Sequence, residues 1–164
     1  MLFARAVILI LLIGSRMFAA APAPPENVDG FTSIMYILRN PTSFNVVVGE
    51  LQTTRLDALL EKNRGNEKIT FLAPTDQALN FFGQLGALRG TPLLESFLKF
   101  HMLDGLWTRK RIRANRTART LSGKPLNLRD IGRILYSIET DNGMIHIIEK
   151  VVLHPDVKKK LNIK

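Results

Sequence analysis

The spacing of apolar residues changes along this chain, and that change limits the possible folds more than any other feature. Helical spacing runs over Phe31–Leu38 and over a second segment from about Phe44 to Leu60. Lys68–Leu72 is a short apolar run typical of a buried strand, and helices are predicted after it. Apolar residues then alternate at Ile134–Ile138, and Met144–Val152 is the β-branched run of a central strand. This order of elements predicts an α+β fold.

Turn and cap residues indicate where these elements end. Thr75 or Asp76 is expected to cap the helix after the first strand, because either side chain can accept hydrogen bonds from free helix amides. Thr91-Pro92 is expected to open a further helix, which Asp104-Gly105 would end. Asp141-Asn142-Gly143 is typical of a hairpin turn, so the last two strands are predicted to be antiparallel neighbours.

Residues 1–21 have the order of a secretory signal peptide: a positive start, an apolar run and then small residues. We expect cleavage between residues 19 and 23, followed by a Pro/Ala linker at 22–27. The alternative is an uncleaved anchor or a buried helix, but Arg16 interrupts the run, and a spanning helix needs roughly 20 apolar residues. Asn115-Arg116-Thr117 is an N-glycosylation acceptor, which fits export. We therefore predict a secreted, extracellular protein that does not span the membrane after cleavage.

The composition narrows the classes of site and of partner. The length of 164 residues suits one domain, and the absence of cysteine excludes disulfides and thiolate metal sites. The net charge of +9 favours anionic partners such as sulfated polysaccharide or acidic lipid. Residues 157–164 are expected to be a basic tail, frayed or briefly helical.

Two segments carry more information than periodicity does. Ile69–Leu79 reads ITFLAPTDQAL, and Asp141–Leu153 reads DNGMIHIIEKVVL. Both resemble the signature boxes of fasciclin-like domains, and Phe100-His101 between them resembles that family's Tyr-His pair. The resemblance covers nearly all of residues 28–156, the expected domain. It implies a wedge-like β-sheet structure flanked by helices, and work in cell adhesion or the extracellular matrix without enzymatic activity. The structural signature residues would be Thr75, Asp76, Asn142, Gly143 and His146.

The chain departs from the family pattern at its adhesive elements. Phe100 lacks the hydroxyl of the usual tyrosine, and the acidic segment that some adhesive members carry before the second box is replaced by Tyr136–Glu139. There is no Arg-Gly-Asp, since Arg64-Gly65-Asn66 lacks the carboxylate. Apolar or conservative changes stand at Leu72, Leu79 and Glu149. Phe100 and His101 are still the adhesion motif that the resemblance implies.

Catalytic and metal-binding chemistry is not indicated. His101, His146 and His154 lack the spacing of metal ligands, and His146 is expected to be a hydrogen-bonded core residue. Ser96, Ser122 and Ser137 do not lie in a nucleophile elbow, and no glycine-rich phosphate loop is present. We expect no enzyme activity, no metal and no cofactor.

A basic segment runs from Trp107 to Arg133 and is the chain's most individual feature. It is either a solvated face or an anion-binding site, with Trp107 offering an aromatic surface and arginine suiting sulfate and phosphate. A glycan on Asn115 would cover part of it. The expected anion-binding residues are Trp107, Arg109, Lys110, Arg111, Arg113, Arg116 and Arg119.

Three functions follow from these observations. The first is a secreted domain for cell adhesion or matrix association, which binds a matrix or cell-surface protein or a glycosaminoglycan. The second is a module for anionic surfaces, heparin-like polysaccharide or acidic lipid, and it can coexist with the first. The third is a carrier or enzyme whose pocket the sequence does not reveal. Nucleic acid is not expected as a partner, because export and the lack of a nucleic-acid motif speak against it.

Overall fold

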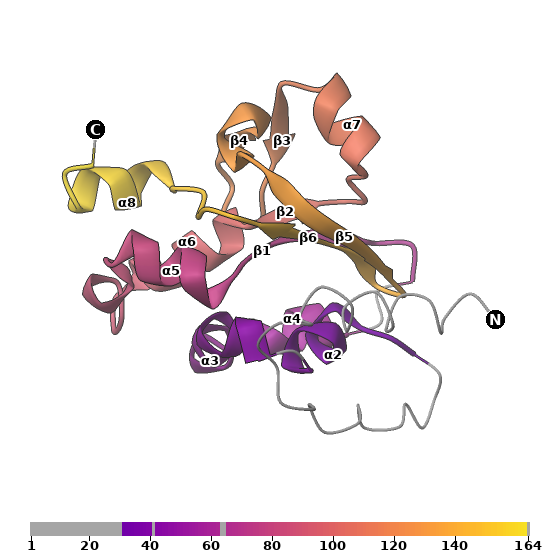
Figure 1. Ribbon diagram of the computed structural model, residues 1–164, viewed down its shortest axis with the longest axis horizontal. Helices are drawn as coiled ribbons and strands as arrows, with labels where there is room; N and C mark the ends of the chain where they lie inside the picture. The colour runs from indigo at the N-terminus through magenta and orange to yellow at the C-terminus, as the bar shows by residue number, and fades with distance from the viewer. Residues whose placement is uncertain (1–30, 41, 63–64, 164) are drawn as a thin grey trace.

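A four-stranded mixed sheet lies at the centre of the structure, with the strand order β2–β1–β6–β5 (Figure 1). The computed structural model describes residues 31–40, 42–62 and 65–163, so the expected signal peptide at 1–21 and linker at 22–27 lie outside it. The strands are β1 Ile69–Pro74, β2 Met102–Asp104, β3 Thr117–Arg119, β4 Pro125–Asn127, β5 Ile134–Thr140 and β6 Gly143–Ile148. The α-helices are α2 Ile34–Arg39, α3 Asn45–Thr53, α4 Asp57–Glu61, α5 Asp76–Phe82, α6 Pro92–Phe100, α7 Arg109–Ala114 and α8 Pro155–Lys160. Short 3-10 helices are η1 Thr42–Phe44, η2 Leu85–Ala87 and η3 Leu128–Ile131.

The two middle strands, β1 and β6, are parallel, and each has an antiparallel strand at its outer edge. β5 and β6 form the hairpin that the Asp141-Asn142-Gly143 turn predicts. β6 is shorter than the expected 144–152 run, because its partner strand ends at Pro74, which lies opposite Ile148 and has no amide proton to continue the ladder. Helices around a mixed sheet confirm the α+β prediction.

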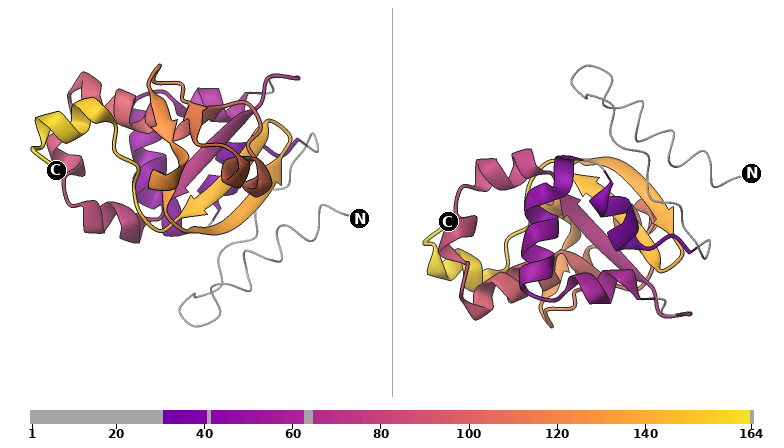
Figure 2. Two further views of the ribbon diagram at one scale, coloured as in Figure 1. Left: turned by 90° about the horizontal axis from the view of Figure 1, so that it is seen from above. Right: turned by 90° about the horizontal axis from the view of Figure 1, so that it is seen from below.

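Each face of the sheet has its own hydrophobic core, since alternate residues of a strand point to opposite faces. Phe71 and Ile145 point into the main core, which helices α2 to α6 and α8 cover. Leu72 and Ile148 point the other way, into a second core that includes Ile112 of α7. Figure 2 shows α2, α3 and α4 below the sheet, and α7 and β4 above it. The second core supports the part of the chain in which the basic segment lies.

The single helix predicted for 44–60 is wrong, because the chain breaks it into α3 and α4. α3 ends at Thr53, and Arg55 adopts a left-handed conformation with a φ of 59°. A non-glycine residue in this conformation ends a right-handed helix. The turn allows Leu56 and Leu60 to be buried in the main core.

The predicted end of the helix that Thr91-Pro92 opens is also wrong. α6 ends at Phe100 and not at Asp104-Gly105, because residues 102–104 form β2 and pair with β1. The edge of the sheet therefore takes a segment that the sequence pattern assigned to a helix.

The C-terminal segment expected to be a basic tail packs against the domain. α8 places Val157 in the main core with no exposed surface, and Leu161 contacts the same core. His154 caps α8 by accepting a hydrogen bond from the Asp156 amide at 3.1 Å. The packed structure therefore extends to at least Leu161.

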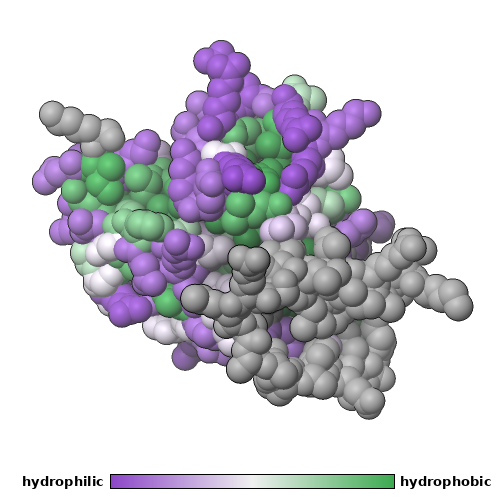
Figure 3. Space-filling model, in the orientation of Figure 1, coloured by the Kyte–Doolittle hydropathy of each residue, from purple (hydrophilic) through white to green (hydrophobic). Residues whose placement is uncertain are grey.

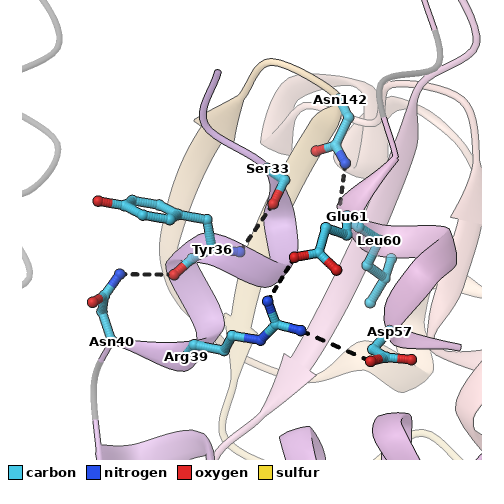
Figure 4. A network of polar contacts seen from close by, with 8 residues as sticks. All are labelled: Ser33, Tyr36, Arg39, Asn40, Asp57, Leu60, Glu61 and Asn142. Carbon is cyan, nitrogen blue, oxygen red and sulfur yellow. Dashed lines mark hydrogen bonds and ion pairs between the residues drawn. The ribbon is translucent and has the colours of Figure 1, made fainter. Parts of the chain in front are cut away.

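Asn142 joins the β5–β6 hairpin to the N-terminal helices (Figure 4). Its side-chain oxygen accepts a hydrogen bond from the Ile34 amide at 2.9 Å, and its Nδ2 donates to the Leu60 carbonyl at 2.7 Å. Gly143 follows it, and a side-chain carbon there would lie 1.7 Å from the Ile69 carbonyl oxygen. No other residue can occupy this position without moving β1, which explains why the turn has Asn and Gly in this order.

Candidate functional site

A groove lined by arginines lies between α7 and the connection from η3 to β5. Its volume is about 690 Å³, and apolar side chains of Ile112, Leu128 and Ile134 contribute to its lining. In Figure 3 a hydrophobic patch ringed by hydrophilic side chains is visible where α7, β3 and β4 lie. The arginines of the groove are Arg109, Arg113, Arg116, Arg129 and Arg133.

The first wall of the groove is α7. Thr108 caps the helix by accepting a hydrogen bond from the Arg111 amide at 3.2 Å. Ile112 is the buried residue of this helix and holds it against the second core. Because one turn of apolar contact anchors the helix, its basic residues remain near the surface, and Arg113 is exposed on the groove side.

The second wall depends on the small β3–β4 sheet. β3 and β4 pair with Ala118 opposite Leu126, and both of these residues are buried. The Leu128 amide donates to the Arg116 carbonyl at 2.9 Å, and the Asn127 side chain accepts from the Arg129 amide at 3.2 Å. These bonds bring Arg116 and Arg129, 13 positions apart in the printed sequence, to the same groove.

Gly132 shapes the loop that carries Arg133. Its φ is 72°, a conformation that L side chains rarely adopt, and an added side-chain carbon would lie 2.5 Å from Cε of Lys150. The Lys150 stem therefore lies against this glycine, and the tight loop brings Arg133 to the groove.

The groove concentrates positive charge without compensation. None of its described lining residues is a carboxylate. Nor does any of its five arginines form an ion pair with a carboxylate in the described part of the chain. Elsewhere the chain does pair its cations, as with Arg89 and Glu50 at 2.5 Å and Arg39 and Glu61 at 2.6 Å. An anion that enters the groove would meet guanidinium groups with free N–H donors.

Trp107 is not an open aromatic surface for a ligand, so this part of the sequence prediction is wrong. Its side chain is buried in the second core, and its Nε1 donates to the Asp104 carbonyl at 2.8 Å. The Arg111 guanidinium covers the ring at 4.0 Å from its centroid and also donates to the Leu106 carbonyl at 2.6 Å. Trp107 thus stabilises the loop before α7 and does not face a partner, whereas Arg111 remains exposed while its guanidinium contacts the ring and the Leu106 carbonyl.

The remaining predicted anion-binding residues divide into two groups. Arg109, Arg113 and Arg116 line the groove, whereas Lys110 and Arg119 are exposed outside it. Arg109 is half-buried: its Nε donates to the Ser137 hydroxyl at 2.7 Å and its Nη2 to the Leu135 carbonyl at 3.0 Å. Two of its five N–H groups are therefore engaged and three remain for a ligand.

Sequence reasoning missed Arg129 and Arg133 as members of the site. Both lie in the basic segment, but at least 16 positions of the sequence separate them from the basic residues of α7. Their proximity follows from the β3–β4 pairing and the Gly132 turn. The Pro-Leu-Asn-Leu stretch at 125–128, with Asn127 before η3, was the available signal that the chain returns at this point.

Phe100 and His101 are inside the domain, and neither side chain can contact a partner in this fold. Phe100 is 3% exposed and His101 is 1% exposed. His101 Nδ1 is 2.9 Å from the Phe97 carbonyl, and its Nε2 accepts a hydrogen bond from the Val152 amide at 3.2 Å. Burial lowers the pKa of His101 to about 4, against the opposing effect of the Phe97 hydrogen bond. His101 of the expected adhesion motif therefore connects α6 to the segment after β6 through these two hydrogen bonds.

His146 is the hydrogen-bonded core histidine that the sequence predicts. It has no exposed surface, and its ring nitrogens lie 2.7 Å from the Ser137 hydroxyl and 2.5 Å from the Trp107 carbonyl. Burial lowers the pKa of His146 below its ordinary value, the hydrogen bond to Trp107 opposes this, and the Arg109 charge adds to it. Ser137 thus connects the buried histidine to an arginine of the groove.

Thr75 and Asp76 have structural roles at the strand-to-helix corner. The Thr75 hydroxyl accepts from the Ala78 amide at 3.1 Å and so caps α5, as predicted. The Asp76 carboxylate reaches the neighbouring helix and accepts from the amides of Asn45 and Val46 at 3.1 and 2.9 Å. One corner therefore fixes the N-terminal ends of two helices.

Other possible sites are less developed. A second hollow of about 810 Å³ lies beside Phe81, whose side chain is 82% exposed, and its lining mixes Asp76 and Glu149 with Lys150. Within the described ranges no three His, Asp or Glu side chains form a group that could hold a metal ion. No described helix combines the length and the hydrophobicity needed to cross a bilayer.

Comparisons with known proteins agree with the architecture. The model of the Fasciclin domain family matches residues 42–154. The chain is similar to the solved FAS1 domain pair from the insect cell adhesion molecule Fasciclin I, with a TM-score of 0.59 and 14% sequence identity. The match covers 77% of this chain and 52% of that one, so it spans about half of the domain pair. No curated protein matches the chain significantly.

Proposed function

Because the chain belongs to the fasciclin domain family, we propose that it is a secreted, non-enzymatic domain for cell adhesion or matrix association that binds an anionic partner in its arginine groove. Fasciclin domains occur in extracellular and cell-surface proteins and are generally adhesive, not catalytic. The observation that carries the proposal is the convergence of five arginines on one groove with no carboxylate among its described lining residues. Because Phe100 and His101 are buried and cannot contact a partner, we assign binding to the arginine groove.

Sulfated glycosaminoglycan is the partner that best fits the chemistry. Arginine presents a planar fork that pairs with sulfate oxygens, and a polymer can engage several arginines at once. The apolar part of the lining also suits the carbon face of a sugar ring better than a fully hydrated ion. An acidic lipid surface is the alternative, and a matrix protein with an acidic segment would use the same arginines.

Binding to a heparin oligosaccharide tests the proposal with two variants of equal charge, which are produced, like the wild type, without glycosylation. The groove variant replaces Arg113, Arg116 and Arg129 with Ala, and the control variant replaces Lys158, Lys159 and Lys160 of α8 with Ala. All six side chains are exposed, so both variants lose three positive charges with little effect on the core. If each arginine contributes about 0.5–1 kcal/mol, the groove variant should bind about ten to a hundred times more weakly, whereas the control variant should change little.

The dependence on salt gives a second measurement. The slope of log affinity against log salt should become less steep by about one for each engaged arginine removed. Equal weakening of the groove and α8 variants would show attraction to net charge alone and would overturn the groove as the site. Vesicles with and without anionic lipid, tested with the same variants, distinguish the lipid alternative.

A further inference from the structure

Asn115 lies at the rim of the arginine groove in a position that a modification would change. It is the residue after α7, with extended backbone angles of φ −118° and ψ 155°, and it is one of the groove's lining residues. Its side chain is exposed, as is that of Thr117 at the start of β3. Asn115-Arg116-Thr117 is therefore an acceptor triplet presented at the surface, with groove arginines on both sides of Asn115.

We propose that Asn115 carries an N-linked glycan and that this glycan closes the arginine groove to polyanions. The proposal rests on the proposed function, because it concerns access to the same site. It assigns two states to one chain: an unmodified form that binds sulfated polysaccharide, and a glycosylated form in which a bulky neutral oligosaccharide covers the guanidinium groups. The fraction of chains modified at Asn115 then sets the fraction that can bind.

The covalent step uses the free position of the Asn115 amide. Nδ2 has two hydrogens and donates one to the Arg111 carbonyl at 2.8 Å. A bond forms between Nδ2 and C1 of the sugar of a lipid-diphosphate-linked oligosaccharide. The bond from C1 to the phosphate oxygen breaks, the lipid diphosphate leaves with the electron pair, and Nδ2 loses one proton. The remaining N–H can still donate to Arg111, so the modification leaves the end of α7 intact.

The position of the attachment makes a steric effect on the groove arginines the expected one. Arg113 is two residues before Asn115 and Arg116 is the next residue, and both line the groove. A glycan on Asn115 therefore begins between two of the arginines that a polyanion must reach. A neutral oligosaccharide adds no charge to the protein, so attraction at long range is preserved while close pairing is prevented.

Two substitutions at Thr117 give a matched test. Thr117→Ala removes the acceptor triplet and leaves Asn115 in place, whereas Thr117→Ser keeps the triplet at a similar cost to β3. The full chain is secreted from eukaryotic cells that add no sialic acid, the occupancy of Asn115 is measured by intact mass, and the dissociation constant is measured for a heparin oligosaccharide. Wild type and Thr117→Ser should be glycosylated and should bind at least tenfold more weakly than Thr117→Ala. Trimming the glycan to its first sugar should recover most of that loss.

Each contrary result refutes a separate statement. If intact mass shows Asn115 unmodified in the secreted wild type, the modification is refuted. If occupied wild type and Thr117→Ala bind equally, closure is refuted while the groove stands. If Thr117→Ala binds no better than a chain that also lacks Arg113, Arg116 and Arg129, the proposed function fails, and with it the closure.

Discussion

His101 makes the stability of this domain depend on pH, and the size of the effect can be worked out from the structure. Its Nδ1 lies 2.9 Å from the Phe97 carbonyl and must carry the hydrogen, because a carbonyl can only accept. Its Nε2 accepts from the Val152 amide and therefore has no hydrogen. Protonation would place a second N–H against that amide inside the core. The neutral ring is thus the form that the fold requires.

The direction and the size of the change in stability follow from the pKa of His101 in the unfolded and in the folded chain. The unfolded chain has the ordinary histidine pKa of 6.5, and in the folded chain burial lowers the pKa of His101 to about 4. Between these values the unfolded state binds more protons, so stability falls as pH falls from about 6.5 to 4. A gap of about 2.5 pH units at about 1.4 kcal/mol per unit corresponds to a loss of about 3 kcal/mol. Burial also lowers the pKa values of His146 and His154, which add to the loss in the same direction.

Urea unfolding between pH 7 and pH 4 measures the effect, with fluorescence of the chain's one tryptophan, Trp107, as the probe. His101→Gln removes the titrating group, so its stability should fall by about 3 kcal/mol less than that of wild type over this range, whatever its stability at pH 7. Carboxylates and the other two histidines contribute equally to both proteins and cancel. Parallel curves for the two proteins would refute the reasoning. An NMR titration of wild type in which His101 protonates near its ordinary pKa would refute it as well.

Three further perturbations test the structural roles assigned above. Asn142→Ala should lower the free energy of unfolding by about 3 kcal/mol in urea, because buried groups on two helices lose their partner. Asp76→Ala should cost about 1–2 kcal/mol through loss of the cap on α3, and Asp76→Asn, which keeps an acceptor, should cost less. Arg116→Gln should raise the melting temperature at low salt by relieving repulsion in the groove, and the gain should disappear in high salt. The control Arg39→Gln removes a guanidinium that is paired with Glu61, so it should not raise the melting temperature.

The sequence predicted the centre of the fold well because local chemistry determines it. The alternation at Ile134–Ile138 and the Asp141-Asn142-Gly143 turn specify the β5–β6 hairpin whatever surrounds them. The break at Arg55 was not predictable in the same way, since a left-handed arginine has no local preference in its favour and follows from the packing of α3 and α4. β2 was missed because an edge strand of three residues is too short to show a period.

The basic segment shows a different limit of sequence reasoning. A run of arginines gives the sign and density of charge, but not which side chains share a surface. Trp107 was assigned to the ligand surface because it adjoins the run, whereas burial in the second core removes it from that surface. Arg129 and Arg133 join the groove through backbone pairing and one glycine turn, which are contacts between segments. Such contacts become visible only when the chain is folded.

The groove differs from an ordinary basic surface in what holds its walls together. Clustered guanidinium groups repel one another, and no described carboxylate among the lining residues offsets that repulsion. The walls are held instead by Ile112 in the second core, by the caps from Thr108 and Asn127, and by the β3–β4 pairing. Arg109 donates two of its N–H groups to Ser137 and to the Leu135 carbonyl and keeps three for a partner, and none of the five groove arginines is paired with a described carboxylate. A carboxylate on either wall would relieve the repulsion and abolish the site, so the same feature that weakens the free domain is the one that would bind an anion.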